Sequence, residues 1–270
     1  MTPASRTPPT GEDQRGSGAL ARGIHILQAF SAETPALSAR ELMAATGLPK
    51  PTLFRLVTTL CETGLLRYEE TDGRFVPAPG LARLAEPLLA RIPIRQLAFG
   101  QMQALADKVC GQVSLSLGLR LDLVYTELAQ SRDCPTVRPA MGSHISLSRT
   151  ASGRAYLSAL PPDQAERYQR QLHARDAAHA DWLQGRMIET RRDLAERGFC
   201  ISRGDLHRQL EAVAAPLRTA ANAEEVHVFT CTVPSFELKP GQLLDDVGPR
   251  LATLARSIEA ALGALPSPDA

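Results

Sequence analysis

The sequence has few aromatic residues and no long apolar run. Aromatic side chains make up 4% of its 270 residues, and there is a single tryptophan. No stretch of about 18 uncharged apolar residues occurs, and the first residues of the chain contain no apolar signal core. We therefore expect neither a membrane-spanning helix nor export, and we predict a cytoplasmic protein.

An excess of charge of one sign is also lacking. The chain carries 30 Lys and Arg residues against 29 Asp and Glu residues, for a formal net charge of +1. This balance excludes a histone-like basic coat and a polyacidic tail. Any contact with nucleic acid must therefore come from a locally basic face.

The cysteines and histidines show no metal-binding pattern. The five cysteines are scattered and include no C-x-x-C pair, which favours reduced, mostly buried thiols over disulfides or a zinc site. His173 and His179 lie in a polar stretch without a neighbouring thiolate or paired carboxylates, and we interpret both as solvated surface residues. We expect no metal ion and no cofactor.

The two ends of the chain differ from its middle. Residues 1–17 and 266–270 are rich in Pro and small polar residues, so they have too little apolar surface to offset the entropy of ordering. We predict that both are disordered tails. The next segment, Gly18 to Phe30, has apolar residues at helical spacing and is predicted to form an amphipathic helix.

Two short helices are predicted between residues 38 and 63. Ser38 and Glu41 have the spacing of a capping box, so a helix begins at Ser38, with Leu42 and Ala45 on its buried face. Gly47 ends this helix because it tolerates positive φ, and a proline-containing segment starts the next helix. The apolar stripe of that next helix consists of Leu53, Leu56, Val57 and Leu60.

A two-stranded wing follows these helices. Leu65 to Tyr68 and Arg74 to Val76 have the pattern of strands, and the Asp72-Gly73 pair between them favours a tight turn. Two short helices joined by a glycine-containing turn and followed by a hairpin are typical of a winged helix-turn-helix, which we place at residues 18–78.

The second of the two helices carries polar and basic side chains opposite its apolar stripe. Such a helix fits the major groove of DNA, where Arg55 can pair with guanine and Phe54 can touch a thymine methyl. The candidate DNA-binding residues are Ser38, Lys50, Thr52, Phe54, Arg55, Thr58 and Arg74. The alternative is a helical packing module in which Arg55 is a solvated charge and Phe54 packs on the first helix.

The rest of the chain is predicted to form a linker helix and a second domain. Residues 79–92 form the linker helix, which Pro93 closes, and residues 93–265 form an α/β (α+β) domain. In that domain we expect a mainly antiparallel sheet with helices at both ends. Predicted helices lie at 94–109, 151–160, 162–172, 182–197 and 242–262, and predicted strands at 113–119, 121–128, 199–202, 212–217 and 226–233.

Three stretches of the sequence carry a family resemblance. They are RGIHILQAF, LSARELMAATGLPKPTLFRLVTTLCETGLLRYEETDGRFVPAPGLARLA and HISLSRTASGRAYLSALP. They resemble the isocitrate lyase regulator (IclR) family of bacterial transcription factors, and the resemblance covers residues 18–262. It implies a winged helix-turn-helix, a linker helix and an effector domain with a GAF-like fold, assembled as a homodimer or homotetramer.

The same resemblance implies a repressor or activator that binds palindromic operator DNA, often to control catabolic genes. The effector it implies is a small organic acid, aliphatic or aromatic. In the family the loop before a GKA-type helix faces the effector; here that loop consists of Thr150, Ala151, Ser152 and Gly153. Arg154 follows, where Lys is usual. A carboxylate also seeks an unpaired helix N-terminus, although an N-cap without a ligand explains these residues equally well.

Further positions of the family's pocket align with Ser202, Ala212, Thr230 and Thr232. Ser202 stands where the family has an acidic residue, although Asp205 lies close by. Ala212 stands where the family often has Cys. These departures leave the identity of the effector open.

No catalytic motif supports an enzyme. Gly16 to Ala21 matches G-x-G-x-x-A, but no predicted strand precedes it, and G-x-S-x-G, Walker A and H-E-x-x-H motifs are lacking. The alternative hypothesis is a small-molecule-binding enzyme or sensor whose amino-terminal helical module mediates protein contacts rather than DNA binding.

Overall fold

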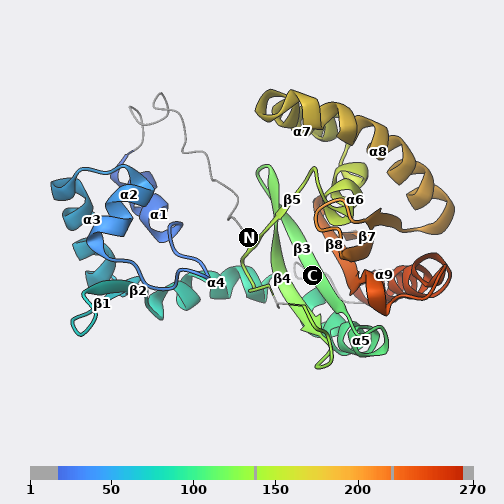
Figure 1. Cartoon of the computed structure of the whole chain (residues 1–270), viewed down its shortest axis with the longest axis horizontal. Helices are drawn as coiled ribbons and strands as arrows, with labels where there is room; N and C mark the ends of the chain where they lie inside the picture. Colours follow the sequence, from blue (N-terminus) through green and yellow to red (C-terminus); the bar gives the residue numbers. More distant parts are fainter. Residues whose placement is uncertain (1–17, 137–138, 220–221, 264–270) are drawn as a thin grey trace. The chain divides into compact units, whose positions relative to one another are not determined.

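The chain folds into two compact units, which divide after Arg91 (Figure 1). The computed structural model describes residues 18–136, 139–219 and 222–263. The predicted tails, 1–17 and 266–270, lie outside these residues. Within the described ranges, no helix is long and apolar enough to cross a membrane.

Helices and one hairpin form the first unit. Its elements are α1 (Ala19–Leu27), α2 (Ala39–Thr46), α3 (Lys50–Glu62), β1 (Leu66–Glu69), β2 (Arg74–Pro77) and α4 (Gly80–Ala90). The two strands pair antiparallel, and Leu37 forms a bridge with Phe75, so the segment before α2 adds to the hairpin. No residue of α4 is fully buried, although Leu81, Ala85 and Leu89 are half-buried.

Local signals set the boundaries of α2. The Ser38 hydroxyl accepts from the Glu41 amide, and the Glu41 carboxylate accepts from the Ser38 amide, which completes the predicted capping box. Gly47 ends the helix at a φ of 67°. Ala45 is exposed rather than buried, because the side of this two-turn helix that faces the core carries Leu42 and Thr46, four residues apart. Thr46 is buried instead, and its hydroxyl donates to the carbonyl four residues earlier.

A six-stranded antiparallel sheet is the centre of the second unit. Its strand order is β5-β4-β3-β8-β7-β6. The strands are β3 (Gln112–Leu119), β4 (Asp122–Gln130), β5 (His144–Ser146), β6 (Cys200–Arg203), β7 (Leu210–Thr219) and β8 (Asn222–Pro234). The pattern of the sequence did not predict β5, because an edge strand of three residues is too short to show alternation.

Helices cover both faces of this sheet rather than its ends (Figure 1). α5 (Ile94–Lys108) and α9 (Gly248–Gly263) pack on one face, and a π-helical segment, Leu243–Val247, leads into α9. α6 (Ala151–Ala159) packs on the other face, and α7 (Pro162–Arg175) and α8 (Ala177–Arg197) pack against it.

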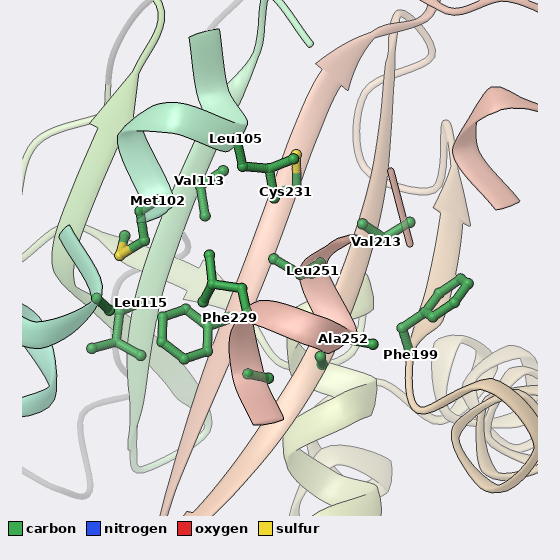
Figure 2. Packing of buried hydrophobic residues seen from close by; sticks show 14 of the residues in the cluster. Met102, Leu105, Val113, Leu115, Phe199, Val213, Phe229, Cys231, Leu251 and Ala252 are labelled. Atoms are coloured by element: carbon green, nitrogen blue, oxygen red, sulfur yellow. The ribbon is translucent and has the colours of Figure 1, made fainter. Parts of the chain in front are cut away.

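Alternate side chains of the central strands enter different layers. Val113 and Leu115 of β3 join Phe229 and Cys231 of β8 in the core beneath α5 and α9 (Figure 2). Because successive side chains of a strand point to opposite faces, the intervening Ser114 faces α6. Most side chains on the face beneath α5 and α9 are therefore apolar, although Glu127 and His227 also lie on it, and the α6 face carries the polar side chains described below.

Two helical glycines predict opposite effects of the same substitution. A Cβ atom at Gly153 of α6 would overlap the carbonyl group of Leu147, whereas a Cβ atom at Gly185 of α8 would meet nothing within 4 Å. We expect Gly153→Ala to lower the free energy of unfolding by about 1–3 kcal/mol, because backbone must move to relieve the overlap. We expect Gly185→Ala to raise it by about 0.5–1 kcal/mol, because Ala favours the helix. Chemical denaturation measures both, and equal effects of the two substitutions would contradict this packing.

Candidate functional site

The outer face of α3 carries most of the predicted DNA-binding side chains. The apolar stripe Leu53, Leu56, Val57 and Leu60 is buried in the core of the first unit. This packing turns the opposite face outward: Lys50, Phe54, Arg55 and Thr58 are exposed, and Thr52 is half-buried. Phe54 is 42% exposed and outside the apolar core, and the Lys50 ammonium lies 5.8 Å from the centre of its ring.

This face of α3 is positively charged. The ion pairs of the first unit join Arg67 to Glu69 and Arg74 to Glu41. Lys50 and Arg55 take part in no ion pair with the described residues. Their charged groups are therefore available to an external anion, and the groups that α3 presents suit both phosphates and base edges.

Ser38 and Arg74 hold the wing and α2 together. Arg74 donates from Nη1 to the Ala36 carbonyl at 2.9 Å, and the same nitrogen lies 3.1 Å from the Glu41 carboxylate. Hydrogen bonds from Ser38, followed by the charge of Arg74, keep the pKa of Glu41 below its ordinary value. Sequence reasoning proposed both residues for DNA contact, but in this structure both are bonded inside the domain. Arg67, which is exposed on β1 and pairs with Glu69, was not among the predicted residues.

In the second unit, polar side chains line the α6 face of the sheet. One row across four neighbouring strands consists of Ser202, Ala212, Thr232 and Gln112. The adjacent row, two residues along, includes Thr230 and Ser114. We call this group of five polar residues the polar floor: Gln112, Ser114, Ser202, Thr230 and Thr232.

Several polar atoms here lack hydrogen-bond partners. The Thr230 hydroxyl and the Gln112 side-chain carbonyl are buried, and neither has a partner among the described residues. Gln130, which pairs with Gln112 across the strands, also has a buried, unpartnered side-chain carbonyl. A buried polar group left unsatisfied costs about 1–3 kcal/mol. A cluster of such groups marks a place where a ligand or water completes the hydrogen bonds.

The start of α6 lies over this part of the sheet. The Cys200 thiol of β6 is 3.4 Å from the Ala151 carbonyl. Thr150 is the N-cap: its hydroxyl accepts from the Gly153 amide at 3.0 Å and lies 2.9 Å from the Ser152 hydroxyl. The predicted effector loop is thus the N-cap and first turn of α6, and its three helical residues are buried.

Arg154 is buried to 1% exposure and joins three elements. Its Nε donates to the Thr190 hydroxyl of α8 at 3.2 Å, and its Nη2 donates to the Ile201 carbonyl of β6 at 2.8 Å. Nη2 also lies 2.9 Å from the Asp205 carboxylate. Nη1 is buried without a partner among the described residues. This guanidinium therefore holds α6, α8 and the end of β6 together.

Asp205 supplies the carboxylate that Ser202 does not. It accepts a 2.8 Å hydrogen bond from the Ser202 hydroxyl and pairs with Arg186 at 3.1 Å. Burial acts to raise the pKa of Asp205, but the Ser202 hydroxyl and the guanidinium groups of Arg154 and Arg186 outweigh it and lower the pKa. The carboxylate is therefore ionised beside the polar floor.

His179 is not the solvated residue that the sequence suggested. It is half-buried, its ring stacks on Trp182 at 4.8 Å, and its Nε2 is buried without a partner in the described structure. The prediction was wrong because α8 begins at Ala177 and buries one side of a stretch that looks polar in sequence. His173 is exposed, as predicted. The described residues contain no group of three or more His, Cys, Asp or Glu that could hold a metal ion.

The predicted effector residues lie apart from four cavities of the second unit. Four cavities of about 210 to 670 Å³ open on the described surface of the second unit, and none of the four is lined by any of the eight predicted effector residues. The structure brings these residues together around the start of α6 and the polar floor.

Both units match the same family. Residues 19–70 match the IclR helix-turn-helix domain, and residues 87–259 match the bacterial transcriptional regulator IclR C-terminal domain. The chain belongs to the IclR family of transcriptional regulators. Its members in the comparison are transcriptional regulators rather than enzymes.

Individual relatives span nearly the whole chain. The HTH-type transcriptional regulator TsaQ1/TsaQ2 of Comamonas testosteroni is 28% identical and covers 92% of this chain and 90% of its own length. A crystal structure of an IclR family transcriptional regulator from Brucella abortus is 33% identical, covers 97% of both chains and superposes with a TM-score of 0.77. An IclR homolog from Microbacterium hydrocarbonoxydans, complexed with 4-hydroxybenzoate, is 17% identical, covers 92% of this chain and 100% of its own, and has a TM-score of 0.74.

Asp205→Asn tests the buried ion pair. We expect it to lower the free energy of unfolding at pH 7 by about 3–5 kcal/mol, because the Arg154 guanidinium stays buried without its anion. Since the folded-state pKa of Asp205 is depressed, its contribution is present above the ordinary aspartate pKa and is lost as pH falls through the folded value. Urea titrations of the unmodified chain and of Asp205→Asn should give free energies of unfolding whose difference is largest at pH 7 and decreases below about pH 4.

Asp163→Asn is the matched control for this measurement. Asp163 pairs with Arg167 at 3.1 Å on the surface of α7, where both side chains are more than half exposed. Its loss should change the free energy of unfolding by less than about 1 kcal/mol. A change in the free energy of unfolding for Asp205→Asn as small as that of the control would contradict the role assigned to the Asp205 carboxylate.

Proposed function

We propose that this IclR-family regulator binds palindromic operator DNA through α3 and responds to a small organic acid held in its second unit. One observation carries the proposal: α3 turns a cationic, hydroxyl-bearing face outward while its leucines anchor it in the core. In this arrangement residues 18–78 bind DNA, residues 93–265 bind the effector, and residues 79–92 form the helix that links these two domains. The proposed assembly is a homodimer or a homotetramer.

In the proposed complex the amino-terminal half of α3 enters the major groove. Arg55 donates two hydrogen bonds to a guanine, and Phe54 contacts a thymine methyl. Lys50, Thr52 and Thr58 contact phosphates, which fix the register without reading sequence. Two copies of α3 in a dimer address two half-sites about one helical turn apart, so the operator is palindromic.

Arg55→Ala and Lys50→Ala separate base reading from phosphate binding. In gel-shift titrations against the region upstream of the protein's own gene, Arg55→Ala should weaken operator binding by about 1–3 kcal/mol and relax sequence preference. Lys50→Ala should weaken binding to all sequences alike. It should also reduce the slope of log K against log salt concentration by about one, the amount expected for one lost phosphate contact. Arg191→Ala removes an exposed cation from α8 and serves as the control, which should bind normally. Normal retention of operator by Arg55→Ala at moderate salt would contradict the proposal.

The proposed effector site combines the polar floor with the first turn of α6. Three observations support it: the unpartnered Thr230 and Gln112 groups, the N-terminus of α6 with its partial positive charge, and the buried Arg154 beside Ser202. The carboxylate would lie at the N-terminus of α6, near Ser152, and the Thr230 and Thr232 hydroxyls would bond the rest of the molecule. The structural neighbour bound to 4-hydroxybenzoate supports an aromatic acid as one class of effector, and catabolic genes are the proposed targets.

Ser152→Asp and Thr230→Val test this site. Ser152→Asp should abolish the effect of carboxylates on operator binding while leaving operator binding itself measurable, because a second negative charge repels the carboxylate. Thr230→Val should weaken the response at least several-fold, because it removes a hydroxyl without changing the shape of the side chain. The readout is gel shift with a panel of aliphatic and aromatic acids that includes 4-hydroxybenzoate. Thr253→Val, on the exposed side of α9, is the control. If carboxylates still affect operator binding by Ser152→Asp, the first turn of α6 is not part of the effector site.

A further inference from the structure

A groove lined by arginines runs between the β3–β4 turn and the α7–α8 junction. It consists of an inner cavity of about 210 Å³ and an outer cavity of about 670 Å³, which share Leu121, Asp122 and Arg175. None of the predicted effector residues lines either cavity. The groove is therefore separate from the proposed effector site.

Most guanidinium groups of the groove have no anionic partner. Arg149 and Arg175 line the inner cavity, and Arg120 lines the outer one. None of these three forms an ion pair with a described carboxylate, whereas Arg167, also on the outer wall, pairs with Asp163. Guanidinium groups that converge on a cavity without counter-ions favour an oxyanion, which they can bind through paired hydrogen bonds.

The other lining groups fit the same ligand. Asp176 is occupied as the N-cap of α8, where it accepts from the His179 amide at 3.1 Å, so Asp122 is the carboxylate that opposes the arginines. His179 contributes a buried Nε2 that has no partner within the described structure. Leu172 and Leu183 supply an apolar wall to the inner cavity. The groove thus offers excess positive charge together with a surface for a carbon skeleton.

We propose that this groove binds a small organic anion with two oxyanion groups. One oxyanion lies in the inner cavity between Arg149 and Arg175, and the other lies in the outer cavity near Arg120. The inner volume admits a metabolite but not a nucleic-acid strand or a protein segment. A polycarboxylate and a phosphorylated acid share this chemistry, and the experiment separates them.

A ligand here has a short path to the start of α6. The Arg149 amide donates to the Ser146 hydroxyl at 3.3 Å, and the Thr150 hydroxyl donates to the Ser146 carbonyl at 2.7 Å. An anion that fixes Arg149 therefore acts on the segment that positions the N-cap of α6. Binding to the groove is independent of the proposed function, whereas an effect on the effector response rests on it.

Isothermal titration of the full chain tests binding with citrate and pyrophosphate as probes and acetate as the single-charge comparison. Citrate or pyrophosphate should bind at least tenfold more tightly than acetate. Tighter binding of citrate assigns the groove to a polycarboxylate, and tighter binding of pyrophosphate assigns it to a phosphorylated acid. Binding of neither probe would overturn the proposal.

The double variant Arg149→Ala, Arg175→Ala should weaken binding of the preferred probe at least tenfold. Both side chains are exposed, so the fold should persist, and circular dichroism checks this. Arg170→Ala removes an exposed arginine of α7 that lines neither cavity, and it should bind the probe within twofold of the unmodified chain. Equal affinities of the double variant and the Arg170 control would overturn the site.

Arg55→Ala separates this result from the proposed function. It removes the proposed base contact in the first unit and should leave the affinity for the probe unchanged. Loss of operator binding with retained anion binding supports the groove, whereas loss of anion binding in Arg55→Ala would contradict an independent site.

Discussion

The second unit is organised around one buried charge. The Arg154 guanidinium is 1% exposed, and an ion removed from water must find both a counter-charge and hydrogen-bond acceptors. It finds them on α8, on β6 and at Asp205, so these elements must keep their positions relative to α6. The same ion pair holds Asp205 against Ser202 and thereby fixes one edge of the polar floor. A lysine has three donors around one point and could not reach three such partners in one plane.

A smaller version of this constraint operates in the first unit. Arg74 ties the wing to the start of α2 through Glu41, and Ser38 completes the connection. These groups are exposed, so the pair contributes less to stability than the Arg154 network does. Its consequence is geometric, because the N-terminus of α2 and the wing cannot move apart while the bonds persist. Arg74 and Glu41 thus satisfy each other within the domain, whereas Lys50 and Arg55 on the outward face of α3 take part in no ion pair with the described residues.

Sequence reasoning succeeded where the physics is local. The capping box at Ser38, the positive φ at Gly47 and the apolar stripe of α3 each depend on neighbours within four residues or so. The winged helix-turn-helix, the antiparallel sheet and the family were accordingly predictable. Alternation in β3 also contained the signal for the polar floor, since Gln112, Ser114 and Ser116 alternate with apolar residues, but this signal was not used. The roles assigned to the DNA-binding and effector residues stay predictions.

The failures arise from contacts between distant parts of the chain. The partners of Arg154 lie 36 and 47 residues away, and no spacing rule reveals them. His179 looked solvated because its neighbours in sequence are polar, whereas its burial comes from α8 and from stacking on Trp182. The placement of helices on both faces of the sheet likewise follows from the two cores that the folded strands create. The local sequence pattern predicts the helices and strands, but the way these elements pair decides which polar groups are left without partners.

Under the proposed function, those unpartnered groups connect the fold to regulation. A buried polar atom that is left without a partner costs about 1–3 kcal/mol. In the proposed effector site, an acid that satisfies the Thr230 and Gln112 groups would remove this cost, and it would favour the arrangement of α6 in which those hydrogen bonds form. Because the Arg154 network joins α6 to α8 and β6, a shift of α6 on binding would act on all three elements together.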